Sequence, residues 1–304
     1  MNYGMPYKGS KNLIAEKLMR LLPPAKHFYD LFGGGGAMSH CALLSGKYKV
    51  VHYNELNPLV FRGFQMFING EFKTENRWIS REEFFKLKNT DPYVAICFSF
   101  GNNLRTYFCN VETEAFKKAV HYSIYFDDNS LLSEYEDLSG FKYLSNNFKE
   151  RRLQLQRYFS VLFKQNKLNP VILNYVSSSN NIIRAVSQNN QNLERLNEYD
   201  AGNDIILTNQ SYSDVKIEPD SVIYCDPPYL GTEQYRNQFS TEKFYTWLKE
   251  SKSLIYVSEY QMPPDFTEVL AVQKQCRLNN KVPKKTVEKL YCNRADFHPS
   301  GFLF

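Results

Sequence analysis

The chain lacks a long apolar run and lacks paired cysteines, and each absence excludes a class of protein. No apolar stretch approaches the length that crosses a membrane. Residues 1–11 carry glycine, proline and lysine instead of the apolar segment of a signal peptide. The six cysteines show neither Cys-x-x-Cys pairing nor zinc spacing, which indicates free thiols in a reducing cytosol. We therefore expect a cytoplasmic protein with no membrane partner and no metal site.

Composition permits several functions. The 304 residues suffice for one large α/β domain or two modest ones, and 43% hydrophobic residues, with 15% aromatic, provide a sizeable core. The net charge of +5 and the pI of about 8.7 are compatible with nucleic-acid binding and equally with an ordinary protein surface.

The most informative motif is Asp226-Pro227-Pro228-Tyr229, which follows the apolar run Ser221–Cys225. The run is typical of a buried strand, and two prolines forbid its continuation because neither has an N–H for the ladder. An acid, carbonyl oxygens and an aromatic ring then meet at a strand's carboxyl end, where open α/β sheets bind ligands. The motif resembles the catalytic signature of amino-methyltransferases, which transfer a methyl from S-adenosylmethionine to an exocyclic amine. A plain turn after a strand is the alternative.

A second motif is a loop of four glycines, Gly33 to Gly36. The preceding stretch His27–Phe32 predicts a strand, and the following stretch Ala37–Leu44 predicts a helix. Glycines let a ligand approach the backbone and leave helix N–H groups accessible. The loop is neither a Gly-Lys-Ser/Thr phosphate loop nor Gly-x-Gly-x-x-Gly. It suits the methionine part of S-adenosylmethionine, whose ammonium Asp30 can bind.

Two weaker signals accompany these motifs. Glu55, after the predicted strand Lys49–Tyr53, is placed to take two ribose hydroxyls. Lys11 begins a predicted helix that runs to Leu22 with Ser10 as its N-cap. A lysine there is disfavoured by the helix dipole and predicts a carboxylate partner, for which the cosubstrate carboxylate would serve. Each residue could equally lie on a solvated surface.

The order of elements indicates a doubly wound fold interrupted by a long insert. Further strands are predicted at 204–208, 221–225 and 254–258, a helix at 241–250, and a hairpin from 271–277 and 287–291. Between them, about 72–191 is rich in aromatic and basic residues; Lys149–Lys167 predicts a long basic, aromatic helix, and Asn189–Asn197 the end of another.

Taken in this order, the motifs resemble the Dam family of DNA adenine-N6 methyltransferases, closest to its phage members. The resemblance covers 1 to about 67 and 205 to about 293, and it includes Ser99-Phe-Gly-Asn-Asn-Leu-Arg105. It implies an α/β, Rossmann-like S-adenosylmethionine-dependent methyltransferase fold in 1–71 and 200–304. A mostly helical target-recognition domain is expected at 72–199. The family usually has Asp where this chain has Glu55, and the middle is longer and more basic than in compact members.

The resemblance also implies roles for individual residues. Asp226, Pro227, Pro228 and Tyr229 would be catalytic, clamping the N6 amine of a flipped adenine. Asn102, Asn103 and Arg105 would bind DNA, with Arg105 reading guanine and the asparagines adenine. S-adenosyl-L-methionine would be held by Tyr7, Lys11, Asp30, Phe32, Gly33, Gly35, Glu55, Tyr212, Asp214 and Asp226.

Double-stranded DNA is the expected partner, with many basic residues of the middle segment on phosphates, unless 149–167 is a solvated amphipathic helix. A cognate restriction endonuclease and association with the nucleoid are further expectations. The alternatives are an N4-cytosine DNA methyltransferase, an RNA or protein amine methyltransferase with a similar pocket, and a DNA-binding relic without activity.

Overall fold

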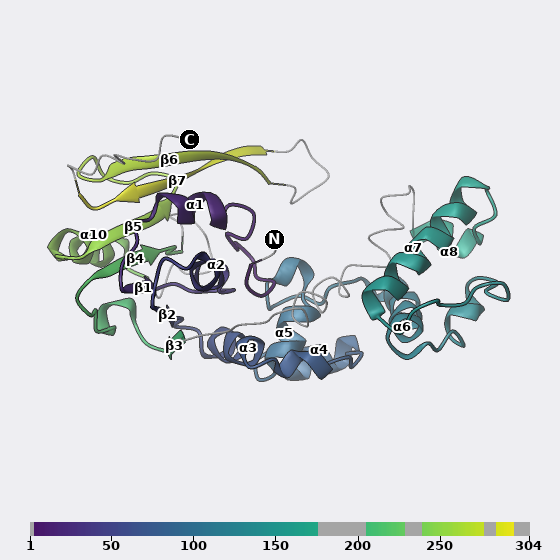
Figure 1. The fold of residues 1–304 in the computed structure, drawn as a ribbon. Coiled ribbons are helices and arrows are strands. Elements are labelled where there is room, and N and C mark those ends of the chain that lie inside the picture. The colour runs from purple at the N-terminus through teal and green to yellow at the C-terminus, as the bar shows by residue number, and fades with distance from the viewer. Residues whose placement is uncertain (1–2, 176–204, 229–238, 277–283, 295–304) are drawn as a thin grey trace. The chain divides into compact units, whose positions relative to one another are not determined.

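The computed structural model describes residues 3–175, 205–228, 239–276 and 284–294. The chain divides into two compact units (Figure 1). The sheet unit comprises Met1–Gly4, Gly9–Gln65 and Ala201–Phe304, and the helical unit Met5–Lys8 and Met66–Asp200. No helix within the described ranges combines the length and the apolar character that a bilayer crossing requires.

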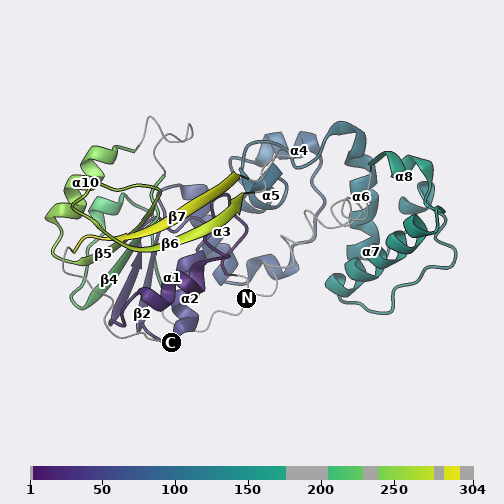
Figure 2. The same cartoon turned by 90° about the horizontal axis from the view of Figure 1, so that it is seen from above.

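The sheet unit is built on seven strands in the order β3-β2-β1-β4-β5-β7-β6. The first five of this order are parallel, and β7 is antiparallel to both neighbours. Figure 2 shows the β6–β7 hairpin reaching beyond the shorter parallel strands. The strands are β1 His27–Asp30, β2 Val50–Asn54, β3 Ile205–Thr208, β4 Ser221–Cys225, β5 Leu254–Glu259, β6 Thr267–Cys276 and β7 Lys284–Cys292.

Alternating side chains of these strands enter two separate cores, because successive residues of a strand point to opposite faces. Phe28 and Tyr224 pack with α1 (Ala15–Leu21) and α2 (Ala37–Ser45) on one face. Their neighbours Tyr29 and Ile223 pack with α10 (Thr241–Glu250) on the other. With both faces covered by helices, the unit is a three-layer α/β sandwich, and the expected Rossmann-like fold is confirmed.

The expected strands, the terminal hairpin and the 241–250 helix are all present, with bounds that differ by a few residues. The helix expected from Lys11 is wrong in its start. It begins at Ala15, and its N-cap residue, Ile14, makes no side-chain cap. Residues 11–14 instead form a turn in which Ile14 N–H donates to the Lys11 carbonyl over 2.9 Å. Ser10 does not cap, because its hydroxyl accepts from Asn12 N–H.

The helical unit packs α6 (Val111–Phe126), α7 (Phe148–Lys164) and α8 (Pro170–Tyr175) around one apolar cluster that includes Phe116, Leu155 and Ile172. The helix expected at 149–167 is confirmed as α7 (Phe148–Lys164). The predicted Asn189–Asn197 helix end lies outside the described residues. The other elements are α3 Pro58–Ile68, which begins in the sheet unit, η1 Glu71–Thr74, α4 Arg81–Leu87, α5 Pro92–Cys97, η2 Phe100–Asn102, α6 Val111–Phe126, η3 Leu132–Glu134, α8 Pro170–Tyr175 and, in the sheet unit, η4 Tyr212–Asp214.

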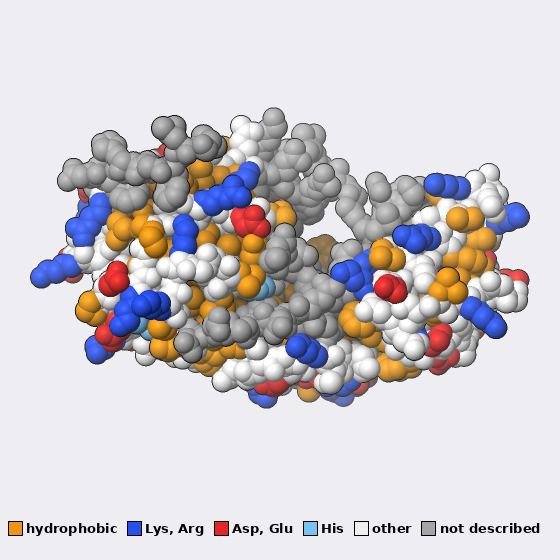
Figure 3. All heavy atoms as spheres, viewed as in Figure 1, with side chains coloured by type: hydrophobic (Ala, Val, Ile, Leu, Met, Phe, Trp, Pro, Cys, Tyr) orange, Lys and Arg blue, Asp and Glu red, His pale blue; other side chains and the backbone are white. Residues whose placement is uncertain are grey.

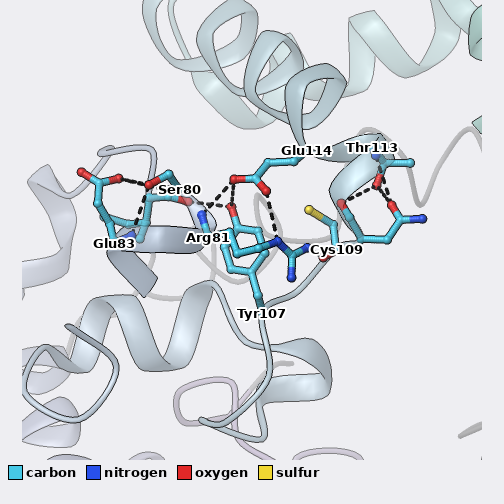
Figure 4. A network of polar contacts seen from close by, with 9 residues as sticks. Ser80, Arg81, Glu83, Tyr107, Cys109, Thr113 and Glu114 are labelled. Atoms are coloured by element: carbon cyan, nitrogen blue, oxygen red, sulfur yellow. Dashed lines mark hydrogen bonds and ion pairs between the residues drawn. The ribbon is translucent and has the colours of Figure 1, made fainter. Parts of the chain in front are cut away.

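A polar network joins the start of α4 to the start of α6 (Figure 4). Ser80 and Glu83 form a reciprocal capping box at the N-terminus of α4. Arg81 pairs with Glu114 over 3.3 Å and also donates to the Cys109 carbonyl. The Tyr107 hydroxyl donates to the Ile79 carbonyl over 2.7 Å. These contacts fix the residues that follow 99–105, the stretch in which the resemblance implies DNA contacts.

Gly36 is a position of the glycine loop that tolerates no side chain. It precedes α2 with φ of 71°, in the left-handed region, and a Cβ there would lie 1.9 Å from the Phe64 ring. The protein's own packing therefore demands this glycine, whatever ligand the loop binds.

Gly36→Ala is expected to destabilise the protein more than Gly46→Ala. Gly46 has a similar φ of 67° but open space around its Cβ position. Gly46→Ala should cost about 1–2 kcal/mol for the left-handed backbone alone. Gly36→Ala should cost about 1–3 kcal/mol more, because it also overpacks against Phe64. Urea unfolding of both variants measures the difference, and equal losses would contradict the steric explanation.

Candidate active site

The site forms where the strand order reverses. β1 lies between β2 and β4, so the chain winds outward from β1 in both directions. Ligands of open α/β sheets bind at such a switch point, outside the carboxyl ends of the strands. Asp30, the last residue of β1, is in register with Tyr224 of β4, and Asp226 follows two residues later. Glu55 follows β2 directly. The topology thus gathers three carboxylates from distant parts of the sequence.

Lys11 is the buried cation of this site. Its Nζ lies 2.6 Å from Asp226 Oδ2 and 2.9 Å from Glu288 Oε1. The side chains of Lys11 and Glu288 are each 4% exposed, and that of Asp226 is 20% exposed. Burial alone would lower the pKa of Lys11, but the two carboxylates outweigh it and the pKa is raised. Lys11 therefore stays an ammonium ion. A carboxylate partner was expected, but both partners belong to the protein.

Around this one ammonium the site is acidic. Asp30 is 1% exposed, and its Oδ2 accepts from the backbone N–H and hydroxyl of Ser39 on α2. Burial raises the pKa of Asp30 to about 7, with Asp226 and Glu55 adding to the rise. Burial also raises the pKa of Glu55. Four acidic side chains against one lysine make the site attractive to a positively charged ligand.

Glu55 fastens the glycine loop to the end of β2. Its carboxylate accepts from Gly34 N–H and Asn57 N–H, each over 2.8 Å. The Tyr53 hydroxyl donates to the Gly34 carbonyl over 2.8 Å. Beneath the loop, a Cβ on Gly33 would meet the Tyr53 ring at 2.1 Å. Gly35 is buried in the same loop.

An aromatic cluster lies beside this loop. The rings of Phe32 and Tyr212 stack with centroids 5.3 Å apart. Phe239 and Phe244 meet both rings, and Trp247 meets Tyr212. Two residues expected to bind the cosubstrate are therefore brought together, whereas Asp214 is exposed on η4. A flat base beside Phe32 and Tyr212 would find apolar ring faces.

Of the other residues expected in the site, Pro227, Pro228 and Tyr7 are among the described residues and Tyr229 is not. Pro227 is buried and Pro228 half-buried at the end of β4, and Tyr229 lies outside the described residues. Tyr7 is half-buried and belongs to the helical unit. The roles of these residues stay predictions.

In the expected DNA-contact loop, the two asparagines and the arginine differ sharply. Asn102 donates to the Ile96 carbonyl over 2.9 Å. The Asn103 side chain accepts from Arg105 N–H and donates to the Thr106 hydroxyl. Gly101, Asn102 and Leu104 all have φ between 54° and 60°, which makes a strained turn. The asparagines thus shape the turn, while the Arg105 side chain is exposed at its tip.

Two arginines of α7 are too buried to contact DNA phosphates. Arg151 and Arg152 are 8% and 7% exposed. Arg151 bonds to the carbonyls of Ser145 and Ile124 and pairs with Asp127, because burial requires partners for its charge. The exposed basic residues of the segment are Lys142, Lys149, Arg157, Lys164 and Lys167. On the face that Figure 3 draws, Lys and Arg side chains are interspersed with acidic ones.

Sequence reasoning missed both Glu288 and Asn54. Buried Asn54 donates to the Leu31 and Gln210 carbonyls and accepts from the Thr208 hydroxyl, which locks the ends of β1, β2 and β3 together. Glu288 is a buried acid that shares a face of β7 with Leu290. An acid in step with inward-facing apolar residues is the signal that could have found it.

Residues 7–291 match the family of D12 class N6 adenine-specific DNA methyltransferases. The chain belongs to this family. It is therefore an adenine-specific DNA methyltransferase that uses S-adenosyl-L-methionine as methyl donor and DNA as substrate, as the sequence predicted. This assignment sets aside the N4-cytosine, RNA and protein alternatives.

Solved structures similar to this methyltransferase include the rRNA methyltransferase AviRa from Streptomyces viridochromogenes. The two are 12% identical with a TM-score of 0.36, over 93% of this chain and 84% of that one. The yhhF protein of Escherichia coli is also 12% identical, with a TM-score of 0.34 over 96% and 92%. TM-scores this low do not establish a shared fold, and the fold assignment for this chain is based on its strand order. No curated protein matches the chain.

The residues present fit the methyl donor. Its sulfonium and ammonium are cationic, and the site holds an excess of carboxylates around one lysine. Its adenine is flat, and Phe32 and Tyr212 provide stacked rings beside the glycine loop. Among the described residues, no cluster of three or more metal-ligating side chains occurs.

Asp30 gives the enzyme a measurable pH dependence of stability. Its pKa is about 7 in the folded protein and about 3.9 in an unfolded chain. The folded state therefore keeps the proton that the unfolded state loses, and the free energy of unfolding falls as pH rises from about 4 to 7. The full effect is on the order of 4 kcal/mol.

Asp30→Asn should remove this slope, since it cannot ionise yet can still accept from Ser39. Urea unfolding between pH 4 and 8 should show the variant gaining on the wild type as pH rises. Parallel profiles for the two proteins would contradict a protonated Asp30.

Proposed function

We propose that this enzyme flips its target adenine out of the duplex and clamps it with Asp226 and the prolines that follow. The observation that carries the proposal is the position of Asp226 at the switch point, held at Oδ2 by Lys11 over 2.6 Å. The N6 atom of a stacked adenine is out of reach of such a site, so the base must leave the stack.

The clamp works by accepting hydrogen bonds. The Asp226 carboxylate and the Pro227 carbonyl accept the two N6 hydrogens, and Tyr229 stacks on the base. Both acceptors draw N6 out of conjugation with the ring and turn its lone pair toward the donor. S-adenosylmethionine supplies the methyl group: the N6–CH3 bond would form as the S–CH3 bond breaks, leaving S-adenosylhomocysteine, and the cationic N6 would then release a proton to water. Positioning and exclusion of water then supply much of the rate increase, and no strong general base is needed.

The donor's binding residues are proposed on the same grounds. Asp30 accepts from its ammonium, which favours the ionised carboxylate at the cost of a proton released. Glu55 takes the ribose hydroxyls, and Phe32 and Tyr212 flank the adenine. Gly33 and Gly35 let the methionine part approach the backbone, while Tyr7, Lys11 and Asp214 complete the site.

Recognition of the DNA sequence is assigned to the helical unit. Arg105 reads a guanine from the tip of the 99–107 loop, and Asn102 and Asn103 lie beside it. Exposed basic residues of α7 contact phosphates. We further propose that the enzyme works in the cytoplasm on nucleoid DNA and is accompanied by a cognate restriction endonuclease.

The clamp is tested with labelled S-adenosylmethionine and unmodified DNA, digested to nucleosides. Wild-type enzyme should place the label in N6-methyladenine, and Asp226→Asn should lower kcat by about 100-fold or more. Asp265→Asn is the matched control, because it removes an exposed acid paired with Lys249 and should leave the rate unchanged. Label in N4-methylcytosine, or full turnover by Asp226→Asn, would overturn the proposal.

Arg105→Ala should weaken binding to the cognate site by about 1–3 kcal/mol and relax preference at one base pair. The comparison is Arg157→Ala on α7, which should weaken binding to all sequences alike. Binding to cognate and scrambled duplexes at fixed salt measures both. A loss from Arg105→Ala that is equal for the two duplexes would refute its base-reading role.

A further inference from the structure

The triad Asp226–Lys11–Glu288 joins the motif carboxylate to a residue near the end of the chain. Asp226 follows β4, Lys11 precedes α1, and Glu288 lies on β7. The two ion-pair distances are 2.6 and 2.9 Å, and Lys11 and Glu288 are buried. Such short, desolvated, charge-assisted contacts are strong and directional.

Glu288 is a charged residue at a buried position, where its desolvation costs free energy. It shares the inward face of β7 with Leu290 and Cys292, which belong to the apolar core that includes α1. A buried carboxylate in such a row usually stabilises less than an apolar residue of similar volume. Packing of the hairpin therefore does not account for Glu288, whereas its contact with Lys11 does.

We propose that Glu288 is a positioning residue for methyl transfer, which acts by fixing the Lys11 ammonium against Asp226. The inference rests on the proposed role of Asp226 as acceptor of the N6 hydrogens.

Two physical effects follow from the second anchor. A lysine side chain has four rotatable bonds, and Lys11 lies in a turn ahead of α1, so one contact alone would let the ammonium move with Asp226. Glu288 holds the ammonium from β7, so the ammonium is fixed on a second side and constrains the direction of the Asp226 carboxylate. Glu288 also takes a share of the positive charge, so Asp226 keeps more of its strength as an acceptor.

The test compares Glu288→Gln with Glu268→Gln in the full-length enzyme. Gln keeps an oxygen near Lys11 but removes the charge. Glu268 is an acid of the same hairpin whose pair with Lys289 is solvent-exposed, so its loss is the matched control. We expect Glu288→Gln to lower kcat by about 10- to 100-fold with the KM for DNA within about twofold. Glu268→Gln should match the wild type, and Glu288→Asp should recover part of the rate.

A double-mutant cycle separates positioning from a structural role. If Glu288 acts through Lys11, adding Glu288→Gln to Lys11→Met should lower kcat no further than Lys11→Met alone. Multiplying losses would overturn the inference, as would a wild-type kcat for Glu288→Gln. If Glu288→Gln does not fold, Glu288→Asp decides: a reduced kcat at unchanged KM supports the inference, and a wild-type kcat refutes it.

The two proposals fail in different ways. Wild-type enzyme that places no label in N6-methyladenine refutes the proposed function and this inference with it. Normal wild-type methylation, a large loss with Asp226→Asn and none with Glu288→Gln refute the positioning role alone.

Discussion

An ammonium ion buried between two carboxylates is the constraint around which the sheet unit closes. Lys11 comes from a turn near the N-terminus, Asp226 from the end of β4 and Glu288 from β7. Lys11 and Glu288 do not tolerate burial alone, because an unpaired charge in a dry interior costs several kcal/mol. The two ion pairs therefore join the turn that holds Lys11 to the end of β4 and to the β6–β7 hairpin. It also leaves Asp226 partly exposed, where a substrate amine can reach it.

Burial raises the pKa of two carboxylic acids of the site, Asp30 and Glu55. Asp30 is held by Ser39 at the start of α2, so its carboxylate is fixed within the sheet's carboxyl edge. Glu55 is held by the N–H groups of Gly34 and Asn57. Because burial raises the pKa of both acids, a cationic ligand that needs them ionised must displace their protons, so its binding should strengthen as pH rises.

Much of this could be predicted from local sequence. A strand such as Ser221–Cys225 can be predicted because it is an apolar run that ends at residues, here two prolines, which cannot continue a strand. The family was predicted from the order of the motifs along the chain. Lys11 shows where local reasoning ends. A helix dipole was the argument for its carboxylate partner, yet no helix begins there, and the partners come from residues 226 and 288. Arg151 and Arg152 teach the same lesson, since a basic helix does not reveal which of its charges face inward. Such placements depend on tertiary packing, which spacing along one element does not encode.

The late position of Glu288 in the chain has a consequence for synthesis. A chain emerging from the ribosome exposes Lys11 first, then Asp226, and finally β7. Domains fold as units during synthesis, and here β7 supplies a charge that the turn holding Lys11 needs. A nascent chain that stops before residue 288 can pair Lys11 with only one of its two carboxylates. The methyl-transfer site is therefore completed only after residue 288 has been translated, and a product that stops earlier carries the motif without its full electrostatic support.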